Sequence, residues 1–216
     1  MLRLYTTPLS ANGRKVLAVS RALGVSCEVH LVNVYMGDGR TPAYLAINPS
    51  GKIPTSVDGA FVLFESNAIL LYLDEAHGGY ALSSSNVQAR SRVAQWLFWE
   101  SAHWQPSLSS VLSEFVAQRL FPERIPSPCS APDWSDGTLL PLLRTVEAAL
   151  AVQPFLTGPK MTLADFSVAG MTTYFKTAGF PFQEYPAISR WYARLEGLDA
   201  WRSTGVPLWT GLAEAH

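Results

Sequence analysis

The chain opens with a strand, a helix and a second strand, all within LRLYTTPLSANGRKVLAVSRALGVSCEVHLV at residues 2–32. Residues 2–6 have the pattern of a short strand, and residues 11–23 carry apolar side chains at helical spacing before a stop at Gly24. Residues 27–32 alternate as a second strand does. Because two parallel strands need a crossover between them, the stretch predicts a βαβ unit.

A short helix, a hairpin and a third helix are predicted to follow. The short helix is expected around residues 41–47. Strand-forming residues at 55–57 and 61–64 are separated by Asp58-Gly59-Ala60, a composition typical of a hairpin turn. Apolar residues at helical spacing then predict a helix over residues 65–76. The first part of the chain is therefore expected to be a mixed α/β domain.

A segment of small and polar residues from Gly78 to Ser85 has the composition of a linker. We therefore predict two domains, at residues 1–78 and 87–216. No later segment has the pattern of a strand, so the second domain is expected to be all-helical. Its predicted helices cover residues 86–120, 136–152, 163–177 and 187–196.

Two local features refine the helical half. Pro106 falls inside the longest predicted helix, where it removes a backbone hydrogen bond and should bend or divide that helix. Residues 162–165, TLAD, have the form of a capping box, with Met161 and Phe166 placed as a hydrophobic staple. This is a helix start to which we assign no chemistry. Residues 121–134, with four prolines, are expected to be a connection.

Composition argues against several classes of partner. The 216 residues have a formal net charge of −1, and the basic residues are scattered, so neither nucleic acid nor a membrane is an expected partner. The start of the chain lacks the features of a signal peptide, and no apolar run reaches about 18 residues, so a cytoplasmic protein is expected. The two cysteines are too few for a disulfide framework, and no cluster has metal-ligand spacing, so no metal is expected.

Four motifs follow one another in a fixed order along the chain. They are YTTPLSANGRKV at residues 5–16, NPSGKIP at 48–54, FESNAI at 64–69 and GPKMTLAD at 158–165. Together they resemble the soluble glutathione S-transferase family over essentially the whole chain. The resemblance implies that the first domain is thioredoxin-like and binds glutathione, and that the all-helical domain contributes the pocket for an electrophile.

Glutathione needs anion donors for its two carboxylates and a group that stabilises its thiolate. Ser66 lies at the start of a predicted helix, where free N–H groups and the helix dipole favour a carboxylate. The resemblance implies that Ser66 binds the glutamyl carboxylate and that Glu65 lies near the amine. The alternative is an ordinary helix cap, for which serine is a preferred residue.

The segment before the third strand supplies the remaining predicted contacts. Ile53-Pro54 resembles the cis-proline step of the family, which turns the backbone of Ile53 toward the cysteinyl part of glutathione. The alternative is a trans proline that opens a strand. Lys52 is a candidate for the glycyl carboxylate, against the alternative of a solvated surface lysine.

Ser10 is the predicted catalytic residue. It lies between the first strand and the first helix, so its hydroxyl could donate to a thiolate that also feels the helix N-terminus. The resemblance is to serine-using classes, and Tyr5 is expected to be structural. Asn12, Thr6 and Thr7 are the competing candidates, because some relatives employ a Thr/Asn pair in this loop. Ser10 could also be a helix cap, and the two roles are compatible.

A protein thiol is not expected to be the nucleophile. No cysteine occupies residues 10–13, which argues against a glutaredoxin-like or omega-type mechanism. Cys27 lies in a predicted strand and Cys129 in a proline-rich loop, so neither lies where a helix dipole would activate it.

The electrophile pocket is expected to involve the bent long helix. Trp99, His103 and Trp104 come just before Pro106, and the i to i+4 spacing of Trp99 and His103 places them on one face of an α-helix. Core packing of the indoles and a structural histidine are the alternatives.

The principal functional prediction is a glutathione transferase, in which the thiolate of the co-substrate glutathione attacks small, largely apolar electrophiles in detoxification. The alternatives are a glutathione-dependent disulfide reductase or peroxidase, and a non-catalytic glutathione-binding module. The resemblance also implies a homodimer.

Overall fold

A computed structural model describes residues 1–7, 9–120 and 130–205. The chain forms two compact units, one of Met1–Arg90 with Leu195–His216 and the other of Ser91–Arg194. The boundary predicted between residues 78 and 87 stays a prediction. The sequence did not indicate that residues 195–205 belong to the first unit.

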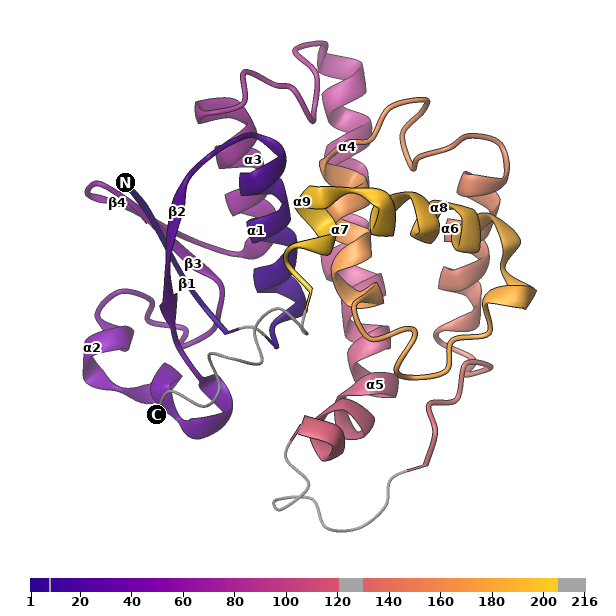
Figure 1. Ribbon diagram of the computed structural model, residues 1–216, viewed down its shortest axis with the longest axis horizontal. Helices are drawn as coiled ribbons and strands as arrows, with labels where there is room; N and C mark the ends of the chain where they lie inside the picture. The colour runs from indigo at the N-terminus through magenta and orange to yellow at the C-terminus, as the bar shows by residue number, and fades with distance from the viewer. Residues whose placement is uncertain (8, 121–129, 206–216) are drawn as a thin grey trace. The chain divides into compact units, whose positions relative to one another are not determined.

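The first unit is built on a four-stranded mixed sheet (Figure 1). Its strands are β1 (Leu2–Thr6), β2 (Cys27–Leu31), β3 (Thr55–Asp58) and β4 (Phe61–Phe64), in the order β2-β1-β3-β4. Strands β1 and β2 are parallel, whereas β3 is antiparallel to both β1 and β4. This arrangement confirms the predicted βαβ unit and hairpin.

Three helices accompany the sheet: α1 (Ala11–Ala22), α2 (Pro42–Leu45) and α3 (Ser66–Ala76). Helices α1 and α3 pack side by side on one face of the sheet (Figure 1). Their inward side chains make the core with those of β1; the buried residues include Leu4, Val16, Ile69 and Leu73. Two short 3₁₀ turns, η1 (Val34–Met36) and η2 (Asp38–Arg40), fill the loop before α2. The unit is the predicted thioredoxin-like domain.

The second unit is helical in the residues that the structure describes. It contains α4 (Val87–Trp99, which begins in the first unit), η3 (Glu100–Trp104), α5 (Gln105–Leu120), α6 (Leu140–Ala151), α7 (Leu163–Thr172), η4 (Phe182–Glu184) and α8 (Pro186–Gly197, which ends in the first unit). Every residue of α7 is buried, so this helix is the centre of the core. The predicted helix over 163–177 ends earlier, at Thr172.

The long helix expected at residues 86–120 is divided by a π-helical segment, η3, which ends two residues before Pro106. Proline cannot donate the backbone hydrogen bond that an α-helix requires, so the regular hydrogen-bonding pattern is interrupted in the turn before Pro106. The predicted division is therefore observed. Of the connection predicted over 121–134, residues 121–129 lie outside the described part of the chain.

The predicted capping box is present at the start of α7, because the side chains and backbones of Thr162 and Asp165 bond reciprocally. The Asp165 carboxylate accepts from the Thr162 N–H at 2.9 Å. It also accepts from the Leu156 N–H at 2.9 Å and from the Trp191 indole at 3.0 Å. This buried carboxylate therefore joins α7 to a preceding loop and to α8, which is more than capping.

A short final helix, α9 (Asp199–Arg202), belongs to the first unit and packs against α1. Sequence periodicity could not reveal it, since four residues make barely one turn. Among the described residues, none of the helices is both long and apolar enough to cross a membrane.

Candidate active site

One edge of the sheet collects three of the predicted motifs. Tyr5 of β1 pairs with Thr55 of β3, and Thr55 pairs with Phe64 of β4. Because β3 runs antiparallel to both neighbours, the end of β1, the beginning of β3 and the end of β4 lie at the same edge. The segments that contain Ser10, Ile53 and Ser66 therefore leave or enter the sheet side by side.

Ser10 occupies the N-cap of α1, with extended backbone angles of φ −84° and ψ 111°. Its Oγ accepts a hydrogen bond from the Gly13 N–H at 3.0 Å. A side chain at Gly13 would meet the Thr6 hydroxyl, since a Cβ there would lie 1.9 Å from Thr6 Oγ1. The absence of a side chain at Gly13 therefore lets the first turn of α1 close against the end of β1. A hydroxyl that accepts this bond still has its own proton to donate.

The start of α3 lies beside this turn. Ser66, the first residue of α3, is buried and its Oγ donates to Asn12 Oδ1 at 3.4 Å. Glu65 precedes it with an exposed side chain and the angles φ 69° and ψ 110°. A positive φ is unfavourable for a residue with a Cβ, and such strained positions cluster at functional sites. Two helix N-termini, with the positive ends of their dipoles, thus meet near Ser66 and Asn12.

The segment before β3 is anchored through its backbone. The Ile53–Pro54 peptide bond is cis. The Lys52 carbonyl accepts from the Tyr44 hydroxyl at 2.7 Å and from the Asn48 amide at 2.9 Å. The Lys52 side chain is exposed, as a group that meets an anion from solvent should be.

A second cation near Lys52 was missed by the sequence analysis. The backbones of Gly39 and Gly51 approach closely, since a Cβ on Gly39 would lie 2.3 Å from the Gly51 carbonyl oxygen. This contact brings Arg40 to the loop, and its Nη1 lies 3.3 Å from the place of a Cβ on Gly51. In the sequence, the only sign of this contact is a glycine in each of the two segments, and a glycine does not show which other segment it will approach.

The three candidates in the helical unit have different environments. His103 is exposed, and Trp99 is half-buried and stacks on Trp104 with ring centroids 5.7 Å apart. Trp104 is 1% exposed and donates from its indole N–H to the Val168 carbonyl at 3.0 Å. Trp104 is therefore a core residue of this unit. An i to i+4 pair shares a face only in an α-helix, and the residues from Glu100 to Trp104 are π-helical, so the spacing of Trp99 and His103 does not place them on one face.

The cysteine that the structure describes, Cys27, does not have the environment of an activated thiol. Cys27 is half-buried on β2, and this burial raises the pKa of its thiol. Cys129 lies outside the described residues. Among the residues that are described, no group of three or more His, Cys, Asp or Glu side chains has the arrangement of a metal site.

Comparison with known proteins agrees with this geometry. Residues 4–81 match the family model for the glutathione S-transferase N-terminal domain, and residues 127–194 match that for the C-terminal domain. Glutathione S-transferase F10 of Arabidopsis thaliana is 30% identical over 211 residues, covering 95% of this chain and 97% of that protein. Glutathione S-transferase 1 of Triticum aestivum is 29% identical, covering 90% and 89%.

The solved structures agree in fold. Glutathione transferase F7 from Populus trichocarpa superposes with a TM-score of 0.82 at 27% identity, covering 94% of this chain and 97% of that one. Likeness of sequence and of fold both extend over nearly the whole chain, and they include the sheet edge that carries the predicted motifs. The chain therefore belongs to the glutathione S-transferase family of enzymes.

Proposed function

We propose that this enzyme conjugates the thiolate of glutathione to small, largely apolar electrophiles. The thiol loses its proton to solvent on binding, and the sulfur lone pair then forms a bond to an electrophilic carbon. A leaving group departs with its electron pair, or a polarised double bond takes up the electrons and then a proton. The observation that carries this proposal is the meeting of Asn12 and Ser66 at the N-termini of α1 and α3.

The glutamyl end of glutathione is assigned to the start of α3. The Ser66 hydroxyl, which donates to Asn12 Oδ1 in the structure, would donate to the carboxylate instead, and the positive end of the helix dipole favours an anion there. Glu65, which precedes Ser66, has an exposed side chain and suits the ammonium group of the glutamyl residue of glutathione. The backbone of Ile53, next to the cis bond to Pro54, is assigned to the cysteinyl part.

The glycyl carboxylate is assigned to Lys52 and Arg40. Both cations belong to the loop that the Gly39–Gly51 contact holds together, and Lys52 is exposed. The planar guanidinium suits a carboxylate through two parallel hydrogen bonds, whereas the ammonium acts as a point charge.

The thiolate is assigned to the first turn of α1. Ser10 has a hydroxyl proton to donate, and the helix terminus adds a positive potential that can lower the pKa of a thiol from ~8.5 to as little as ~3.5–7.5. Asn12 supports the same turn through its contact with Ser66. We assign the catalytic role to Ser10 and keep Asn12 as the rival.

The electrophile is assigned to the helical unit, at the half-buried ring of Trp99 and the exposed imidazole of His103. Trp104 acts there only through Trp99, on which it stacks. The physiological role that fits this chemistry is detoxification in the cytoplasm.

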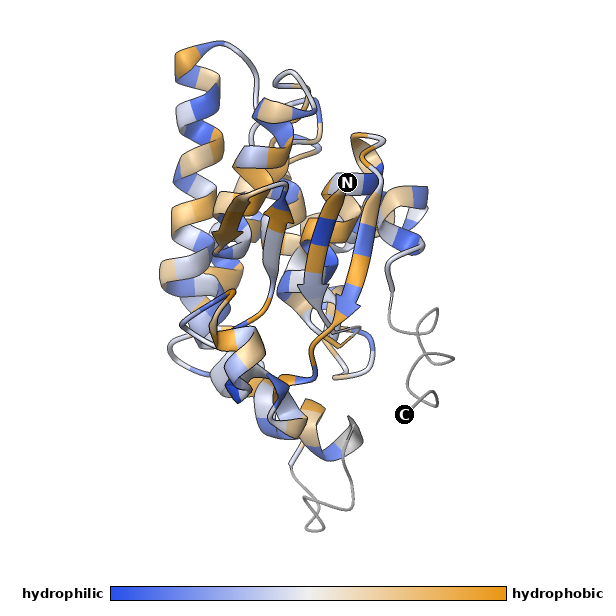
Figure 2. Cartoon of the chain, turned by 90° about the vertical axis from the view of Figure 1, so that its left-hand side faces the viewer, coloured by the Kyte–Doolittle hydropathy of each residue, from blue (hydrophilic) through white to orange (hydrophobic). Residues whose placement is uncertain are grey.

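A homodimer is the proposed assembly. Every side chain of the edge strand β4 is apolar, as its orange colour in Figure 2 shows, and Phe61, Val62 and Phe64 are each at least 40% exposed. Exposed apolar patches of this kind mark interaction surfaces. Light scattering after size exclusion should give twice the chain mass.

The activity is tested by comparing three substrates at saturating glutathione. Conjugation of chlorodinitrobenzene should be fast, with slower reduction of hydroxyethyl disulfide or cumene hydroperoxide. Faster turnover of the disulfide or the peroxide would favour the reductase or peroxidase alternative. Saturable glutathione binding with no turnover of any substrate would leave only a binding module.

A further inference from the structure

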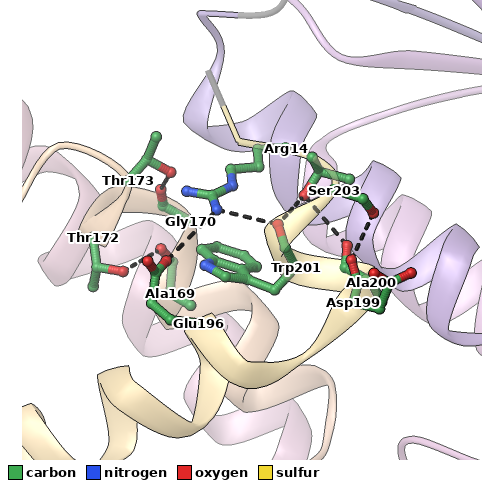
Figure 3. A network of polar contacts seen from close by, with 11 residues as sticks. Arg14, Ala169, Gly170, Thr172, Thr173, Glu196, Asp199, Ala200, Trp201 and Ser203 are labelled. Atoms are coloured by element: carbon green, nitrogen blue, oxygen red, sulfur yellow. Dashed lines mark hydrogen bonds and ion pairs between the residues drawn. The ribbon is translucent and has the colours of Figure 1, made fainter. Parts of the chain in front are cut away.

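The last described helix holds the turn that carries Ser10. Arg14 lies one turn into α1 and its side chain is buried, with 7% exposed. Its guanidinium carbon lies 3.9 Å from the centre of the Trp201 ring in α9, although the two residues are 187 positions apart. Figure 3 shows this guanidinium group extended over the indole.

Polar contacts reinforce the stack. Arg14 Nη2 donates to the Trp201 carbonyl oxygen at 3.2 Å and lies 4.0 Å from Glu196 Oε1 (Figure 3). The same carbonyl accepts from the Thr204 hydroxyl at 2.8 Å. Trp201 and Thr204 are almost fully buried. The face of the indole ring attracts a cation, and this attraction is stronger where both groups are buried away from water.

A second arginine joins the same terminal segment to the other end of α1. Arg21, in the last turn, donates from Nη1 to the Ser203 carbonyl. The terminal segment therefore holds α1 at both ends, but only the Arg14 end lies beside the residues assigned to glutathione.

We propose that Arg14 is a positioning residue, which through its stack on Trp201 fixes the first turn of α1 and with it Ser10 and Asn12. Arg14 follows Gly13 directly, and Gly13 donates to Ser10 Oγ. If the stack loosens, α1 loses its fixed position at this end and the thiolate-stabilising turn changes geometry. Because the intact stack holds this turn, helix α9 contributes to the glutathione site although it is distant in sequence. This inference rests on the proposed function.

The test measures the ultraviolet thiolate titration of bound glutathione together with hydrogen exchange of the Gly13 amide. Arg14→Gln and Trp201→Leu should each raise the pKa of the bound thiol by about one unit and speed exchange of the Gly13 amide. Arg14→Lys, which keeps the charge but loses planar stacking, should shift both readouts in the same direction. Trp201→Phe keeps an aromatic face and should stay close to wild type.

Arg21→Gln is the matched control. It detaches the same segment from the far end of α1, so it should lower the melting temperature without moving the thiol titration. An equal shift in Arg21→Gln would mean general loosening and would overturn the proposal. So would a shift in Arg14→Gln with none in Arg14→Lys or Trp201→Leu, because charge alone would then be responsible.

Failure of the proposed function has a different signature. Wild-type protein that gave no thiolate band with glutathione would contradict the assignment of the site before any variant is made. A normal wild-type titration that is unchanged in Arg14→Gln and Arg14→Lys would reject only the positioning role.

Discussion

The Ser66 hydroxyl lies 3.4 Å from Asn12 Oδ1, and 54 residues separate the two in sequence. The contact joins the first turns of α1 and α3, which the sheet brings to one edge. Each helix start alone is an ordinary structural feature. Together they place the positive ends of two helix dipoles and a serine hydroxyl where an anionic tripeptide could bind.

Ser66→Ala should weaken glutathione binding by ~1.5–3 kcal/mol, because the glutamyl carboxylate loses a charge-assisted hydrogen bond. Calorimetry at constant pH measures the effect. The control is Ser56→Ala, which removes a buried hydroxyl that donates to the Leu63 carbonyl within the sheet. An unchanged dissociation constant in Ser66→Ala would remove Ser66 from the site.

Arg40→Gln should reduce the preference of the enzyme for glutathione over γ-glutamylcysteine, which lacks the glycyl carboxylate. The ion pair between Arg40 and the glycyl carboxylate would be exposed to solvent, so we expect its removal to cost the ~0.2–1 kcal/mol of binding free energy that is usual for such pairs. The measurement is the ratio of kcat/KM values for the two thiols, with Lys52→Gln made alongside. If both variants weaken the two thiols equally, neither cation binds the glycyl end.

Tyr72→Phe should reduce the loss of unfolding free energy that accompanies a fall in pH through the acid range. The hydrogen bond from the Tyr72 hydroxyl to Asp58 Oδ2, at 2.9 Å, is the main cause that lowers the pKa of Asp58, and His77 adds to it. A lowered folded-state pKa stabilises the protein above the unfolded-state value of ~3.9, and this stability is lost as the pH falls through the folded-state pKa. The test is the urea midpoint of the wild-type protein and of Tyr72→Phe, measured at several pH values from neutral down to this acid range. If the midpoints of the two proteins fall in parallel with pH, the prediction is wrong.

Asp165→Ala should destabilise the helical unit by about 3 kcal/mol or more, because it leaves several buried donors without their acceptor. A cap alone would account for only ~0.5–2 kcal/mol. The urea midpoint and slope give the free energy of unfolding, and glutathione affinity in the folded fraction should stay the same. A loss within the range of a simple cap would show that the bonds to Leu156 and Trp191 contribute little.

Most of the fold follows from local pattern, and the exceptions have physical causes. The four strands and the main helices show clear periodicity, and the capping box marks the start of α7. Pro106 indicated a division of the long helix, but the π-helical form of η3 depends on packing in three dimensions. Helix α9 is too short for a periodic signal, and its stacking on Arg14 is a tertiary contact.

The placement of Ser10 and Ser66 at helix starts was predictable, because serine suits a helix terminus. Arg40 was not predictable, because the contact that places it joins two glycine loops. Trp104 and Trp99 are equivalent in sequence pattern, and only burial separates the core residue from the half-buried one.

The assignment of the thiolate to the first turn of α1 is tested most directly by ultraviolet difference titration of glutathione bound to Ser10→Ala, with Asn12→Ala alongside. Removal of a hydrogen bond to the charged form should raise the pKa of the bound thiol, at ~1.36 kcal/mol per unit, and lower turnover at neutral pH more than glutathione affinity. Wild-type titration and rate in Ser10→Ala, with both lost in Asn12→Ala, would contradict the account: Asn12 would be the catalytic residue, and Ser10 only the cap of α1.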